Sequence, residues 1–152
     1  LDYSSKEIYR LITMGITNTW QQHWTDSTTG STLHTIIPKT KRQPIPIKNL
    51  ALREARIINR LYTNKTLITT LNVSNSNNIN CVNCNTPITL KHVINECTKY
   101  TEHRTKLHRT LNSLNTPLTY PEFLKIPENI NLQTTYQAII KFLISTELDK
   151  HI

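Results

Sequence analysis

The spacing of three cysteines and one histidine constrains this chain of 152 residues more than any other feature. The sequence reads Cys81-x2-Cys84-x7-His92-x4-Cys97, and it contains no other cysteine. Three thiolates and one imidazole complete a tetrahedral ligand set for Zn²⁺ and leave no position for water. The alternative is a group of ordinary buried cysteines beside an unrelated histidine. Because the cysteines cluster and two of them form a Cys-x2-Cys pair, the sequence favours a closed, structural zinc site.

Composition excludes several other classes of protein. Only two glycines occur, so the glycine-rich phosphate loops of nucleotide-binding proteins are absent. The apolar runs are far shorter than a membrane span, which predicts a soluble protein with no membrane partner. An odd number of cysteines, with no secretory signal in residues 1–10, predicts a reducing compartment. We expect the protein in the nucleus and cytoplasm.

The charge balance points to an anionic partner. The formal net charge is +8 and the pI is about 9.6, so nucleic acid is the first partner to consider; general basicity for solubility is the alternative. Between Asp26 and Glu96 the only acidic residue is Glu54. The cationic residues that fill this middle region are Lys39, Lys41, Arg42, Lys48, Arg53, Arg56, Arg60, Lys65 and Lys91.

Periodicity predicts a mostly α-helical chain. Apolar residues at three- and four-residue intervals indicate helices near 5–24, 50–62, 90–114 and 132–148. Pro44 and Pro46 favour an extended segment between the first two helices. We therefore expect a small helical domain tied by the Cys-Cys-His-Cys zinc site, with an extended proline-containing segment. The expected divisions are 1–48 (helix and basic linker), 49–115 (helix, zinc knuckle, helix) and 116–152 (turn and helix).

Candidate nucleic-acid contacts are Lys41 and Arg42 of the expected linker and two groups of residues on the predicted helices. In helix 50–62, Arg53, Arg56 and Arg60 fall nearly opposite the apolar side that includes Ala55 and Ile58. This stripe is either the solvated face of an amphipathic helix or a surface that follows phosphates. A second cationic group on helix 90–114 comprises Lys99, Lys106 and Arg109.

Two further details of the helices lead to specific expectations. Trp20 and Trp24 lie one turn apart, and a role in the core is favoured over base stacking. His92 and Cys97 are five residues apart, which is about 140° on an ideal α-helix. For both side chains to reach one metal, the turn between them must widen or the helix must start after it.

Several blocks of the sequence together resemble a known family. In order they are Trp20-Gln21-x-x-Trp24, Leu33-x-x-Ile36-x-Pro38, Ile57-Ile58-Asn59-Arg60-Leu61, and the cysteine block with Thr89-x-x-His92-x4-Cys97, Tyr100 and Arg104. They resemble the region after the ribonuclease H domain in non-LTR retrotransposon polyproteins of the jockey-like and I-like kinds, over roughly residues 2–104. The chain departs from that pattern at Asn64-Lys65, where the family often has Gly-His.

The resemblance implies the carboxy-terminal part of a reverse-transcriptase polyprotein. It implies a zinc knuckle held by Cys81, Cys84, His92 and Cys97 that contacts RNA or single-stranded DNA during target-primed reverse transcription. Its other partners would be the upstream polymerase and ribonuclease H domains. The carboxylate set for two-metal phosphodiester chemistry is missing, so we do not expect the chain to be an enzyme by itself.

Two other functions remain open at this stage. The zinc site can be purely structural, in a domain that docks onto another protein and does not touch nucleic acid. The residues between the ligands are aliphatic and include no aromatic, so base stacking by the knuckle itself is not expected. A hydrolase triad of His23, Asp26 and His34 can be assembled on paper, although nothing in their spacing specifies it.

Overall fold

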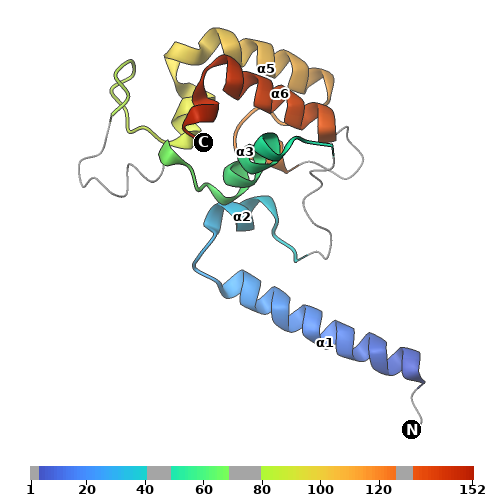
Figure 1. Ribbon diagram of the computed structural model, residues 1–152. Coiled ribbons are helices and arrows are strands. Elements are labelled where there is room, and N and C mark those ends of the chain that lie inside the picture. Colours follow the sequence, from blue (N-terminus) through green and yellow to red (C-terminus); the bar gives the residue numbers. More distant parts are fainter. Residues whose placement is uncertain (1–3, 41–48, 69–79, 126–131) are drawn as a thin grey trace. The chain divides into compact units, whose positions relative to one another are not determined.

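The computed structural model describes residues 4–40, 49–68, 80–125 and 132–152, and these residues are mostly helical (Figure 1). The α-helices are α1 (Ser5–Asp26), α2 (Ser31–Ile36), α3 (Leu52–Thr63), α5 (Thr101–Ser113) and α6 (Leu132–Ser145). Short turns of other kinds are the π-helix η1 (His92–Glu96) and the 3-10 helices η2 (Thr98–Tyr100), η3 (Glu122–Leu124) and η4 (Leu148–Lys150). The described residues contain no β-strand beyond an isolated bridge between Asn80 and Pro87. The predicted helical class is confirmed.

The chain forms two compact units, Leu1–Pro44 and Ile45–Ile152. The three-part division that the sequence suggests, at 48/49 and 115/116, stays a prediction. The expected extended segment, with Lys41 and Arg42, lies outside the described residues. Where the structure describes the chain, no helix is both long and apolar enough for a transmembrane span.

Helix α1 begins where its sequence specifies. The backbone N–H of Glu7 donates to Ser4 Oγ at 3.3 Å, and the Ser4 N–H donates to the Glu7 carboxylate at 2.8 Å. These reciprocal bonds form a capping box that satisfies free donors of the first turn. The predicted start at residue 5 is therefore confirmed, and the helix ends two residues beyond the predicted end.

We expected both Trp20 and Trp24 in the core, and only Trp24 is partly buried. Trp24 is half-buried, lies 4.3 Å from the His34 ring between centroids, and donates from Nε1 to the Ile37 carbonyl at 3.0 Å. Trp20 is 54% exposed, and no residue of α1 is fully buried in the described part of the chain. The prediction was wrong for Trp20, because α2 has only six residues and covers only the last turns of α1.

The core of Ile45–Ile152 is built by α3, α5 and α6, with α5 and α6 side by side (Figure 1). Two hydroxyl groups inside it are paired: Tyr62 and Tyr136 lie 2.9 Å apart, and Tyr62 also donates to the Leu124 carbonyl. Pairing matters here because an unpaired buried hydroxyl is costly. The largest fully buried side chains include Ile58, Leu61, Leu90, Ile94, Leu111, Phe123, Tyr136, Ile139 and Leu143.

The helix expected over 90–114 is interrupted at Cys97. The π-helix η1 precedes this residue, whose ψ of 124° leaves the helical region, and η2 and then α5 follow it. The apolar stripe through Leu90, Ile94, Leu107 and Leu111 is nevertheless buried as predicted. A single continuous helix was thus the wrong prediction for this segment, although its buried face was right.

Candidate metal centre

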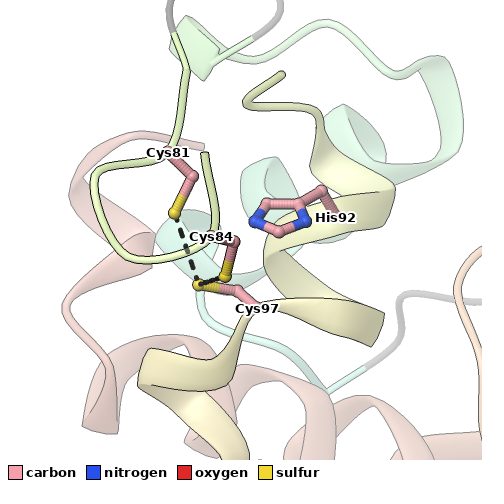
Figure 2. Close-up of side chains that lie close together, drawn as sticks. All are labelled: Cys81, Cys84, His92 and Cys97. Atoms are coloured by element: carbon pink, nitrogen blue, oxygen red, sulfur yellow. Dashed lines mark hydrogen bonds between the residues drawn. The ribbon is translucent and has the colours of Figure 1, made fainter. Parts of the chain in front are cut away.

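Cys81 and Cys84 lie on a tight loop. The Cys81 N–H donates to the Thr86 carbonyl at 2.8 Å, and the Asn85 N–H donates to the Cys81 carbonyl at 2.7 Å. Asn85 adopts φ 52°, in the left-handed region that asparagine tolerates better than most residues. These bonds fold the backbone back on itself, so that both thiols face the same way (Figure 2).

His92 and Cys97 lie at the two ends of η1. The Cys97 N–H donates to the His92 carbonyl at 2.8 Å, which is the i→i+5 bond of a π-helix. The wider turn removes the 140° separation that an α-helix would impose. The expectation that this turn must widen is confirmed.

The four side chains converge on one point (Figure 2). Their ligand atoms all lie within 4.8 Å of one another, and Cys97 Sγ is 3.7 Å from Cys81 Sγ and 4.0 Å from Cys84 Sγ. Tetrahedral zinc with Zn–S bonds of about 2.3 Å would hold its sulfur atoms about 3.8 Å apart. The three thiols are free. The donor set therefore fits a single metal ion with four protein ligands.

The thiols have different electrostatic surroundings. The hydroxyl of Thr98, 3.4 Å from Cys84 Sγ, and its N–H, also at 3.4 Å, lower the pKa of the Cys84 thiol. Burial raises the pKa of the Cys97 thiol to about 11. Deprotonation of this buried thiol therefore costs free energy. A bound cation would offset that cost, because thiols bind metals as thiolates.

The histidine has partners that can fix its tautomer. Thr86 Oγ1 lies 3.2 Å from His92 Nδ1, and a Glu96 carboxylate oxygen lies 3.6 Å from the same nitrogen. When Nε2 binds a metal, the Thr86 hydroxyl can accept the Nδ1 proton, and the nearby Glu96 carboxylate favours the resulting charge distribution. Such outer partners orient metal-bound imidazoles and raise their basicity.

Arg104 braces the backbone around the candidate metal centre, and reasoning from the ligand spacing alone did not single it out. It is buried, and its guanidinium donates to the Ile94 carbonyl at 2.8 Å and to the Cys97 carbonyl at 2.5 Å. Burial lowers the pKa of this guanidinium. A detectable signal existed in the sequence, since Arg104 lies between Tyr100 and Leu107 on the apolar stripe, where a charge needs partners.

The predicted cationic residues that the structure describes are all exposed, but several have partners within the chain. Arg53 pairs with Asp149, and Arg60 donates to the Ile152 carbonyl. Lys106 pairs with Glu102 at 3.3 Å. Neither Arg56 nor Arg109 has an ion-pair partner among the described residues. The α3 stripe therefore combines one arginine that faces solvent with two that also hold the C-terminal segment.

Comparison with known proteins returns no match to any protein-family model, to any curated protein or to any solved structure. The resemblance to retrotransposon polyproteins therefore stays a prediction from the sequence blocks. The geometry of the four ligands is the strongest functional feature of the described residues.

Proposed function

We propose that this chain is a zinc-stabilised helical module that binds RNA or single-stranded DNA, as the carboxy-terminal part of a non-LTR retrotransposon reverse transcriptase. The supporting observation is the exposure of all six described cationic candidates on the unit that holds the metal cluster. The ordered sequence blocks supply the link to the retrotransposon family. These cationic side chains would contact RNA or single-stranded DNA during target-primed reverse transcription.

The net positive charge of the unit that holds the metal cluster supports a nucleic-acid partner. The unit Ile45–Ile152 has thirteen lysine and arginine residues and seven acidic residues. Three thiolates around one dication add only a single negative charge to this balance. Because the net charge stays positive, phosphate contacts should dominate binding and sequence preference should be weak.

The role of the metal in this proposal is structural. Four protein ligands would close the coordination sphere, so no site remains for an activated water. Zinc would link the loop at 80–87 to η1, and through Arg104 to α5. The module would present cationic side chains and carry out no reaction of its own.

Salt-dependent binding tests the proposal. Fluorescence anisotropy of zinc-loaded protein against labelled single-stranded RNA and DNA, from about 50 to 200 mM salt, should give affinity that falls with a log–log slope of about −0.7 per phosphate contact. Arg56→Ala, which removes a solvent-facing arginine, should weaken binding and reduce the slope by about 0.7. Lys6→Ala, in the other unit, is the matched control. Absence of binding at the lowest salt would contradict the proposal.

A second candidate function rests on α1. Its apolar residues Ile8, Leu11, Ile12 and Ile16 are between 47% and 62% exposed. An uncovered apolar helix face fits a protein-docking element whose partner would be the upstream polymerase or ribonuclease H domain. Co-purification with those domains at high salt would favour docking, since an apolar interface survives charge screening.

A further inference from the structure

An apolar cavity of about 340 Å³ opens beside the metal centre. Cys81 and Cys97 contribute to its wall, whereas Cys84 and His92 do not. The cavity therefore adjoins the metal position. Its aliphatic wall consists of Ile68, Val82, Ile88, Val93 and Leu148.

We propose that this cavity receives one unpaired nucleobase of the bound strand; the inference rests on the proposed function. Its volume is at the lower end of the range for small-molecule sites, which suits a single flat heterocycle. None of the residues that line it is acidic. Apolar walls in a cationic unit match a ligand whose flat ring is attached to a phosphate chain.

The polar and aromatic groups of the cavity suit such a ligand. The half-buried Tyr100 supplies a ring for stacking, which any base can use. Lys99 also lines the cavity, with Nζ 5.3 Å from the centroid of that ring, so a phosphate beside a stacked base can reach an ammonium group. The amide of Asn83 offers both a donor and an acceptor to a base edge.

Val82 adds an independent observation. This side chain lines the cavity from the metal loop and is 98% exposed. This exposed aliphatic side chain beside the cavity is available to contact a bound ligand, and covering it would add favourable apolar burial. Tyr100 lies three residues beyond the last ligand, and so the stacking group comes from outside the segment 81–97.

Abasic DNA separates base recognition from phosphate contact. Zinc-loaded protein should bind a single-stranded oligonucleotide about 5- to 100-fold more tightly than an abasic strand of equal length, as expected for one stacked base. Tyr100→Ala should abolish this preference and leave the salt slope unchanged. Tyr100→Phe should retain the preference, and Tyr9→Ala, which removes an exposed ring of α1, should not alter it.

The outcomes distinguish the two proposals. Equal, salt-dependent binding of both strands by the wild-type protein would overturn the base cavity and leave the proposed function standing. No binding to either strand would overturn both. Methyl NMR of the wild-type protein needs no variant: the base-containing strand should shift the Val82, Ile88 and Val93 signals and the abasic strand should not. If the base-containing strand shifted only methyl signals outside the cavity, the result would contradict the inference.

Discussion

At the scale of single residues, Arg104 connects the metal centre to the core. Its buried guanidinium bonds to the carbonyls of Ile94 and Cys97, on either side of the end of η1. Those carbonyls lie where the regular helical ladder is interrupted and need donors from elsewhere. A long side chain with several fixed donors is suited to that task.

Replacing this guanidinium should destabilise the fold. Arg104→Met keeps much of the volume but leaves two carbonyls without their donor, which should lower the free energy of unfolding by about 2–3 kcal/mol. Arg109→Met, on the exposed side of the same helix, should change it by less than about 0.5 kcal/mol. Urea unfolding of the zinc-loaded proteins measures both. If Arg104→Met had the same free energy of unfolding as wild type, the result would show that Arg104 does not brace this region.

Buried tyrosines should make the fold sensitive to alkali. Burial raises the pKa values of Tyr62, Tyr120 and Tyr136 above the ordinary value of about 10. The folded protein thus keeps phenolic protons that the unfolded chain releases, and the stability from this difference is present below pH about 10 and is lost as the pH rises further.

Unfolding in urea at pH 8 and pH 11 measures the direction of this change in stability. Stability should fall between the two values, and Tyr120→Phe should show a smaller fall, because one shifted phenol is gone. Its lost bond to the Leu61 carbonyl should cost about 1 kcal/mol at pH 8. The exposed Tyr9→Phe is the control. An identical fall in Tyr120→Phe and wild type would contradict the assignment.

At the scale of elements, the metal loop and η1 should depend on the ion. Structural zinc contributes about 10–16 kcal/mol in small finger peptides, which is comparable to the whole stability of a domain. Cys84→Ser, or treatment with chelator, should therefore unfold at least residues 80–107 and reduce the helical circular dichroism signal. Val82→Ala, a change in the same loop at a residue that is not a ligand, should leave the signal intact. A Cys84→Ser spectrum that matched wild type would contradict the assignment of a structural metal to these four side chains.

The sequence predicted the elements that local chemistry specifies. Capping by Ser4 and Glu7 fixes the start of α1, and apolar periodicity located α3 to within two residues. The break at Cys97 escaped prediction because the buried stripe continues through it, with Leu90 before the break and Leu107 after it. Periodicity reports which face is buried and is insensitive to a widened turn.

The candidate metal centre was largely predictable, and the surroundings of the cationic residues were not. Ligand types and spacing were enough to select the four side chains that the structure brings together. In contrast, the partners of Arg53 and Arg60 are Asp149 and the Ile152 carbonyl, more than 90 residues away. No local pattern encodes such a contact, since it depends on how α3 and the C-terminal segment pack.

At the scale of the whole molecule, a modest core supports the case for a metal. The chain has only 37% hydrophobic residues, and its two units divide these between them. Few apolar residues limit the stability that hydrophobic burial can supply, and a metal cross-link would add to it. Because the three cysteines are free and converge with a histidine, a metal is the cross-link that this chain can supply.

X-ray absorption spectroscopy at the zinc edge, on protein with its metal content determined, tests whether these four side chains hold a zinc ion. We expect one zinc per chain, with three sulfur ligands at about 2.3 Å and one nitrogen at about 2.0 Å. Cys84→Ser should lose the metal or lose one sulfur from this shell. A protein that retains no zinc, or a shell that contains a water oxygen in place of one of the four side chains, would contradict the closed structural site.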